Sequence, residues 1–215
     1  MSSPKPTQLA TNNFTASNCV LVDSLPAYIE NLTKLRTLSI PHHILSGEIP
    51  VVIRRLGSLQ VLELQVKVFL IPSPAQFVVQ CAFRTGPFEA DANQIVGSIL
   101  LEIGSLKKLK RLELSKNRLS RSLLDQLGEL KELKCILLGE NNLTRSIPAK
   151  FSQLTSLVVL DLSQNDLTVD ILTTLANDVG LKILLLNHNR LSGEIPSSFS
   201  NLSANSQVGK GQDYV

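Results

Sequence analysis

Asparagine recurs at a constant step of 24 residues through the second half of the chain, and this period constrains the fold more than any other feature. Around the last four asparagines, leucine or isoleucine keeps the same phase, with an apolar-x-apolar pair just before the asparagine and another apolar residue just after it. Sequence repeats of this length indicate a solenoid, in which each coil covers its apolar face by stacking on the next. The recurring residues are Asn93, Asn117, Asn141, Asn165 and Asn189.

Each repeat predicts a short strand followed by a polar turn. In a strand, alternate side chains point to the same face, so both leucines of a Leu-x-Leu pair are expected to point into the coil. The asparagine that follows carries a donor and an acceptor, which can bond the main chain of its own coil and of the adjacent one. The five asparagines are therefore predicted to form a structural ladder that satisfies buried backbone groups. A helical rhythm of about 3.6 residues does not fit this pattern.

The repeats resemble those of plant leucine-rich-repeat receptor-like kinase ectodomains. Residues 189–199 read NRLSGEIPSSF, in which the asparagine is followed by the plant form L-x-G-x-I-P. The phrases EIGSLKKLKRLELSKNRLS, QLGELKELKCILLGENNLT and FSQLTSLVVLDLSQNDLT resemble the receptor-like protein kinase 2 type in particular. The resemblance covers residues 25–64 and 92–203. It implies an α/β fold, a right-handed solenoid with parallel strands on its concave face.

Composition agrees with one elongated domain and argues against several classes of partner. Hydrophobic residues make up 43% of the 215-residue chain, enough for a continuous core, and tryptophan is absent, so leucine carries the packing. The net charge of +3 is too small for a dedicated nucleic-acid binder, in which a concentrated basic face is expected. The run KKLKRLELSK over 107–116 is interpreted as a solvated repeat surface rather than a phosphate or membrane patch.

No targeting or membrane-spanning segment is evident in the sequence. Residues 1–10 lack the apolar run of a signal peptide, and no stretch of about 20 apolar residues is present, so we expect no direct membrane insertion by this chain. The resemblance nevertheless implies a parent receptor at the plasma membrane, with its repeats outside the cell. Four glycosylation sequons would be used only in the secretory pathway. They begin at Asn13, Asn31, Asn142 and Asn201.

Three segments depart from the regular repeat. Residues 1–24 are expected to be an irregular N-terminal segment, although LATNNFTASNC within it resembles the start of the kinase domain in the same receptor group. The solenoid itself is assigned to 25–203, with 67–91 either a degenerate coil or foreign sequence inserted between two regular halves. Residues 204–215 are expected to be a disordered tail.

The glycine of the plant motif is kept in some coils and lost in others. Gly97 and Gly193 occupy this position, but Arg121, Arg145 and Val169 replace it in the coils between. Glycine permits tight backbone geometry. An arginine at this position can still be accommodated if its φ angle is negative.

No catalytic, cofactor or metal site is predicted. The kinase motifs H-R-D and D-F-G and the glycine-rich phosphate loop are absent. A triad from Asp161, Ser163 and His188 lacks a nucleophile elbow and an oxyanion hole, so it is disfavoured. The adjacent pair His42 and His43 has no third metal ligand nearby in sequence. The cysteines Cys19, Cys81 and Cys135 form no metal or disulfide pattern, and Cys135 is expected to be a free thiol in a strand.

Binding through the concave face is the favoured function. Residues that alternate with the buried leucines should face outward, and Leu137, Val159, Ile183 and Leu185 are expected to form an exposed apolar stripe, a feature typical of interaction surfaces. The charged neighbours are expected to orient an extended peptide laid across the strands. The predicted ligand-binding residues are Arg111, Glu113, Leu137, Val159, Asp161, Ile183, Leu185 and Asn187.

The sequence therefore predicts a non-catalytic module that recognises a peptide or protein, with the resemblance adding another leucine-rich-repeat ectodomain as a partner. Three alternatives stay open. One is a truncated receptor product without independent function, and another is a portion of a serine/threonine receptor kinase whose catalytic domain is absent here. A soluble inhibitor of a cell-wall enzyme is the third, and it would need a signal peptide.

Overall fold

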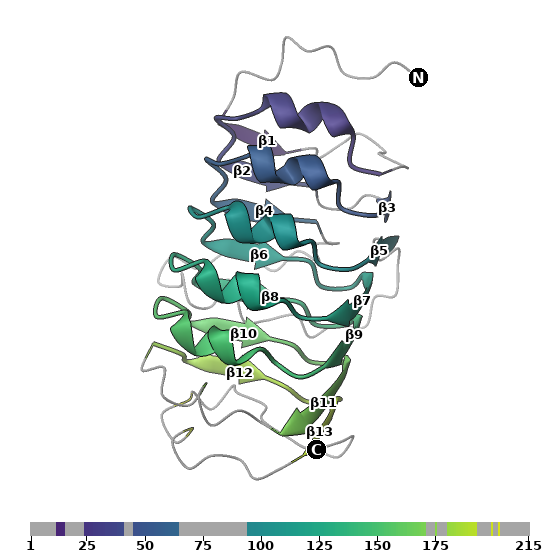
Figure 1. The fold of residues 1–215 in the computed structure, drawn as a ribbon, viewed down its shortest axis with the longest axis vertical. Helices are drawn as coiled ribbons and strands as arrows, with labels where there is room; N and C mark the ends of the chain where they lie inside the picture. Colours follow the sequence, from purple (N-terminus) through teal and green to yellow (C-terminus); the bar gives the residue numbers. More distant parts are fainter. Residues whose placement is uncertain are drawn as a thin grey trace, which may run out of the picture.

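The computed structural model describes residues 12–15, 24–40, 45–64, 94–170, 175, 180–192, 199 and 202. Within these ranges the chain forms stacked coils, with strands on one side and short helices on the opposite side (Figure 1). Several residues and segments singled out from the sequence lie outside the described residues. They are Asn93, His42, His43, Cys19, Cys81, Gly193, Asn201, the segment 67–91 and the tail 204–215.

The apolar-x-apolar segments of the repeats supply six strands of one parallel seven-stranded sheet, and the N-terminal segment supplies the seventh. Each coil contributes a strand of three residues, and neighbouring strands pair in register, as in Leu38 with Leu62. The central residue of each repeat strand is buried, because it points into the coil while its two neighbours point outward. The strands, in spatial order, are β1 (Asn13–Thr15), β2 (Thr37–Ser39), β4 (Val61–Glu63), β6 (Arg111–Glu113), β8 (Cys135–Leu137), β10 (Val159–Asp161) and β12 (Ile183–Leu185).

A second parallel sheet of six strands follows the asparagine turns and forms the adjoining side of the stack. Five described 3-10 helices stack on the side opposite the first sheet (Figure 1). The second-sheet strands are β3 (Ser46–Gly47), β5 (Gln94–Gly97), β7 (Arg118–Ser122), β9 (Asn142–Arg145), β11 (Asp166–Asp170) and β13 (Arg190–Ser192). The helices are η2 (Ala27–Asn31), η3 (Val51–Arg55), η5 (Leu101–Ser105), η6 (Asp125–Glu129) and η7 (Ala149–Gln153).

The helices begin after an extended residue that need not be proline. Pro50 has φ −74° and ψ 143° before η3, and Leu100 has φ −75° and ψ 143° before η5. Leucine reaches the same extended conformation because this region of φ/ψ space is open to every residue. Each helix then packs one apolar side chain into the core, such as Ile53 or Phe151, both fully buried. The loss of the motif proline in some coils therefore leaves the path of the chain unchanged.

The arginines at the glycine position do not have the negative φ angle that would accommodate them without strain. Arg121 has φ 70° and Arg145 has φ 68°, close to the values of 73° for Gly47 and 85° for Gly97. The neighbouring coils fix the path of the turn between strand and helix, so the residue at this position adopts the left-handed backbone conformation whatever its side chain. This conformation costs a residue other than glycine about 1–2 kcal/mol.

The coils on either side of residues 65–93 stack directly on each other. Strand β4 pairs with β6, and β3 pairs with β5, so no coil is interposed between them. The Nδ2 of Asn117 donates to the carbonyl of Leu64 across 53 residues, whereas the matching contact from Asn141 to Leu114 spans 27 residues. The difference, 26 residues, is an insertion between two neighbouring coils. The degenerate coil assigned to 67–91 therefore does not stand in the solenoid between them, because backbone pairing joins the regular strands on either side.

Deleting residues 66–91 is expected to leave the stacking intact and raise the free energy of unfolding by up to about 2 kcal/mol. The deletion places Asn93 three residues after Leu64, the spacing that separates Asn117 from Leu114. The shorter connection also costs less chain entropy to close. Chemical denaturation and far-ultraviolet circular dichroism of the two proteins measure the effect. Deleting the equally long range 118–143, which breaks the repeat phase, is the control and is expected to abolish the cooperative transition. Loss of the cooperative unfolding transition on deletion of 66–91 would contradict the conclusion that these 26 residues are an insertion between neighbouring coils.

The N-terminal segment contributes a strand that the sequence did not predict. β1 pairs in parallel with β2, with Asn13 beside Thr37 and Phe14 beside Leu38. The carbonyl of Asn12 accepts hydrogen bonds from the amides of Arg36 at 2.6 Å and Thr37 at 3.2 Å. Phe14 packs against the core. Residues 1–24 are therefore not irregular throughout, because strand addition satisfies edge backbone groups and requires no leucine-repeat motif.

Candidate functional site

The turns after the first sheet are held by buried asparagine side chains. The Nδ2 of Asn141 donates to the carbonyl of Leu138 in its own coil and to that of Leu114 in the preceding coil, each at 3.0 Å. Its Oδ1 accepts from the amide of Leu119 at 3.0 Å. Asn117, Asn165 and Asn189 repeat this arrangement. One side chain in each coil therefore bridges two coils and pairs backbone groups that would otherwise be buried without partners.

The residue before each described ladder asparagine has a left-handed backbone, which sequence reasoning missed. The φ angles lie between 52° and 56°. No residue type marks the position, because it is lysine, glutamate, glutamine or histidine, so the sequence offers no signal for it. The left-handed residue turns the chain and directs the asparagine amide into the stack. These residues are Lys116, Glu140, Gln164 and His188.

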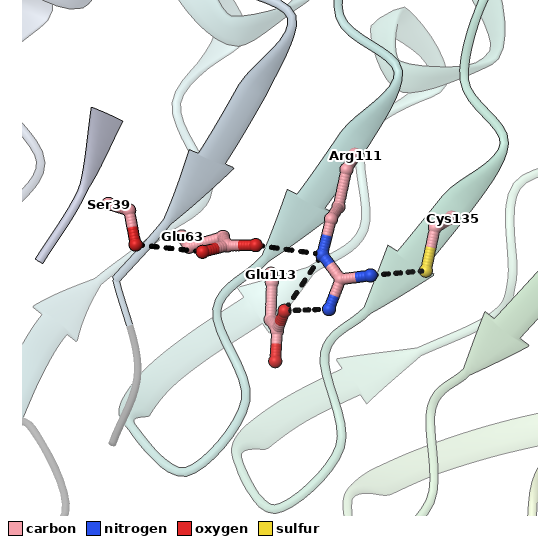
Figure 2. Close-up of polar contacts among 5 residues, drawn as sticks. All are labelled: Ser39, Glu63, Arg111, Glu113 and Cys135. Atoms are coloured by element: carbon pink, nitrogen blue, oxygen red, sulfur yellow. Dashed lines mark hydrogen bonds and ion pairs between the residues drawn. The ribbon is translucent and has the colours of Figure 1, made fainter. Parts of the chain in front are cut away.

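The outward face of the first sheet, which the sequence predicts to be concave, begins with a polar cluster (Figure 2). The Nε of Arg111 lies 3.1 Å from Oε1 of Glu63 and 2.9 Å from Oε2 of Glu113, and its Nη2 forms a further ion pair with Glu113. The hydroxyl of Ser39 donates to Oε2 of Glu63 at 2.8 Å. Nη1 of Arg111 lies 3.9 Å from the sulfur of Cys135. Successive strands thus supply the members of this cluster in register.

Burial makes this cluster an electrostatic unit rather than a set of surface charges. Glu113 is 2% exposed and Glu63 is 8% exposed. Removing carboxylates from water is costly unless an opposite charge and hydrogen bonds compensate, and the guanidinium of Arg111 supplies both to the two glutamates. Sequence reasoning placed Arg111 and Glu113 among the binding residues. In the structure Arg111 instead forms ion pairs with Glu113 and with Glu63. The sequence could not indicate the contact with Glu63, because Glu63 is the register partner of Glu113 although it lies 50 residues earlier in the chain.

The apolar stripe expected on the same face is not exposed. Cys135, Leu137, Val159 and Ile183 form a separate hydrophobic cluster and are at most 5% exposed. The register aligns Cys135, Val159 and Ile183 on adjacent strands, so these side chains cover one another. Adjacent strands lie only about 4.8 Å apart, which makes such contact unavoidable. Only Leu185 of the predicted stripe stays half-buried at the edge of this apolar cluster.

Polar groups border the apolar cluster. Oδ1 of Asp161 accepts from the amide of Ser163 at 2.9 Å and from its hydroxyl at 2.6 Å. A side chain at Gly139 would place its Cβ 2.9 Å from the same carboxylate oxygen, so glycine leaves room for Asp161. Oδ1 of Asn187 is buried and has no hydrogen-bond partner among the described residues. A buried acceptor without a partner is unusual in a folded protein and points to a role beyond folding.

The arrangement does not support the hydrolytic triad considered from the sequence. The hydroxyl of Ser163 donates to Asp161, whereas a nucleophilic serine donates to the histidine that acts as its base. His188 is exposed in the turn before Asn189. Among the described residues, no group of three or more histidine, cysteine, aspartate or glutamate side chains could hold a metal ion. No helix in the described ranges is long and apolar enough to cross a membrane.

The basic run over 107–116 is compensated by acids of the following coil. Lys107 lies 3.0 Å from Glu129, Lys110 lies 3.9 Å from Glu132, and Lys116 lies 3.4 Å from Glu140. The hydrogen bond from Lys107, with its positive charge, lowers the pKa of the exposed Glu129 carboxyl. These pairs agree with a solvated repeat surface. The described sequon residues Asn13, Asn31 and Asn142 are all exposed.

These strands, ladders and stacked helices define a leucine-rich-repeat solenoid. One leucine-rich-repeat family model matches residues 107–167, and a second matches residues 180–202. No curated protein matches the chain. The fold is similar to the ectodomain of the membrane receptor kinase GASSHO1/SCHENGEN3 from Arabidopsis thaliana, in complex with CASPARIAN STRIP INTEGRITY FACTOR 2, at 31% identity and a TM-score of 0.70. That match covers 85% of this chain and 19% of the receptor chain.

Two further structures extend the comparison. The ectodomain of the Arabidopsis receptor kinase HAESA, in complex with an IDA peptide hormone, is 30% identical with a TM-score of 0.66, covering 81% of this chain and 25% of that chain. The BIR3–SERK2 complex from Arabidopsis thaliana matches at 30% identity and a TM-score of 0.55, covering 75% of this chain and 72% of that chain. The protein belongs to the leucine-rich-repeat family, with the fold of plant receptor-kinase ectodomains. The chain spans about a quarter or less of the GASSHO1/SCHENGEN3 and HAESA receptor chains.

Proposed function

We propose that this chain is part of an extracellular receptor ectodomain and binds an extended peptide or a partner ectodomain across the outward face of its first sheet. The observation that carries the proposal is the pair of half-buried side chains Leu185 and Asp161, aligned on neighbouring strands, with the unpaired Oδ1 of Asn187 two residues further along the chain. An apolar contact and a carboxylate thus lie side by side on β12 and β10, and an unpaired acceptor follows β12. The complex of HAESA with an IDA peptide hormone and that of GASSHO1/SCHENGEN3 with CASPARIAN STRIP INTEGRITY FACTOR 2 support the class of ligand.

The predicted binding residues divide into two groups by accessibility. Asp161, Leu185 and Asn187 are only partly covered, so they are proposed to contact the ligand. Leu137, Val159 and Ile183 form a buried apolar floor beneath it. Arg111 and Glu113 are proposed to shape the adjoining end of the site, because their charges already compensate each other within the polar cluster. The ligand therefore needs an apolar side chain for Leu185 and a hydrogen-bond donor for Asp161.

Replacing Leu185 by glutamate is expected to weaken peptide binding by about 30-fold or more, since a charge opposes desolvation at an apolar contact. Peptides would be selected on the full chain from a randomised 12-residue phage library, and their Kd measured by isothermal titration calorimetry. Val51→Glu is the matched control, because Val51 is an exposed apolar residue in η3 on the opposite side, and binding should be unchanged.

The melting temperature of each variant shows whether a loss of binding reflects a loss of fold. Selected peptides that bind Leu185→Glu and the unchanged chain equally well would exclude this face as the site. Failure to select any peptide from a properly folded chain would favour the alternative of a truncated receptor product without independent recognition.

A further inference from the structure

Three exposed arginines gather on the second sheet, away from the proposed peptide site. Arg118 and Arg121 belong to β7, and Arg145 belongs to the adjacent strand β9 (Figure 1). We call these three residues the arginine patch. None of them forms an ion pair with another described residue, whereas Arg190 on the same sheet pairs with Asp166 at 3.0 Å. The patch is therefore a local excess of positive charge on a protein whose net charge is only +3.

The fold does not explain two members of the patch. Arg121 and Arg145 hold left-handed backbones at φ 70° and 68°, at the position where the preceding coils carry Gly47 and Gly97. Glycine adopts this conformation without strain, and arginine does not. Both arginines therefore oppose stability at positions where a better residue for folding exists. Strained residues whose side chains are exposed point to a role in function.

The left-handed turn also displays this part of the strand to solvent. Leu119 and Leu123 are buried on either side, while Ser120, Arg121 and Ser122 between them all stay at least partly exposed. Arg121 is in register with Leu143, so Arg145 lies two residues further along the adjacent strand. Strand spacing and rise place the two Cα atoms about 8 Å apart. This separation approximates the spacing of alternate side chains in an extended peptide, about 6.8 Å.

The chemistry of the patch selects an acidic partner. Each guanidinium is a planar fork that binds a carboxylate through two parallel hydrogen bonds. The neighbouring hydroxyls of Ser122 and Ser146 are partly or fully exposed and can donate further hydrogen bonds to the same groups. We infer that the second sheet around β7 and β9 is a docking surface for an acidic protein segment in extended conformation, with carboxylates at alternate positions. This surface is distinct from the outward face of the first sheet and goes beyond the proposed function.

A double variant separates binding from folding. In Arg121→Gly with Arg145→Gly, the backbone conformation suits the new residues, so the melting temperature should stay the same or rise. Binding of a fluorescein-labelled peptide of six Glu-Ser repeats to the full chain, measured by fluorescence anisotropy, should weaken at least about tenfold. The control, Arg54→Gln with Lys108→Gln, removes two exposed positive charges on or near the helix side and should bind as the unchanged chain does. Binding should also fall as salt is raised, because the charges involved are exposed.

Three results would overturn the inference. The first is equal peptide binding by the double glycine variant and the unchanged chain. The second is an equal loss of binding in the control variant, which would mean that net charge alone decides binding. The third is tighter binding of a twelve-residue thymidine oligonucleotide than of the acidic peptide, which would assign the patch to nucleic acid. Because these variants leave the outward face of the first sheet unchanged, the outcome is independent of the Leu185→Glu experiment.

Discussion

Replacing Asn141 by alanine is expected to lower the free energy of unfolding by about 3–5 kcal/mol, because it removes the side chain that joins two coils. Four hydrogen bonds with buried backbone groups are lost, those to the carbonyls of Leu114, Leu138 and Gly139 and that from the amide of Leu119. The three carbonyls keep a second donor, from Asn117, Asn165 and Lys116 respectively. Each lost hydrogen bond is worth about 0.5–1.5 kcal/mol, and the buried amide of Leu119, which loses its acceptor, costs about 1–3 kcal/mol. Urea denaturation followed by circular dichroism measures the difference.

The neighbouring residue provides a matched control. Asn142 is exposed, and its replacement by alanine should change stability by no more than about 0.5 kcal/mol. Stability in a solenoid is a sum of coil and interface terms, so the Asn141 variant is also expected to melt in two steps, as the coils on either side of the weakened interface lose their coupling. Equal stability of the two variants would show that the ladder contributes little to stacking.

Replacing Arg111 by leucine is expected to destabilise the protein by a similar amount, about 3–5 kcal/mol, for an electrostatic reason. Glu63 and Glu113 would remain buried without the guanidinium that compensates their charge. Removing one partner of a buried charge group costs more than the group contributes when intact, because the remaining charge stays desolvated. Thermal and urea denaturation at neutral pH measure the loss.

Two further variants test the cause. Arg118→Leu removes an exposed arginine without a described ion pair and should have little effect on stability. Adding Glu63→Gln and Glu113→Gln to Arg111→Leu should recover much of the lost stability, since neutral amides need no counter-charge. If the triple variant is no more stable than Arg111→Leu, the loss arises from packing rather than from uncompensated charge.

Much of the fold follows from the repeated pattern because burial is periodic. The Leu-x-Leu pairs specify which strand residues point inward, and buried residues such as Leu112, Ile136 and Leu160 occupy those positions. The outward residues of the candidate site follow from the same alternation. Their accessibility does not, because exposure depends on the residues of neighbouring strands, as the mutual burial of Leu137 and Val159 demonstrates.

The amino-acid sequence by itself determined the repeat length, the inward-facing residues and the asparagine positions, because these depend on side-chain type at a fixed spacing. Tertiary structure alone decided which strands are neighbours, namely β1 beside β2 and β4 beside β6 across a 26-residue insertion. Pairing between strands uses backbone groups that every residue carries, so no side-chain pattern predicts which strands pair. The same reason explains the left-handed Arg121 and Arg145, whose φ angles are imposed by the stacked coils rather than by the residues themselves.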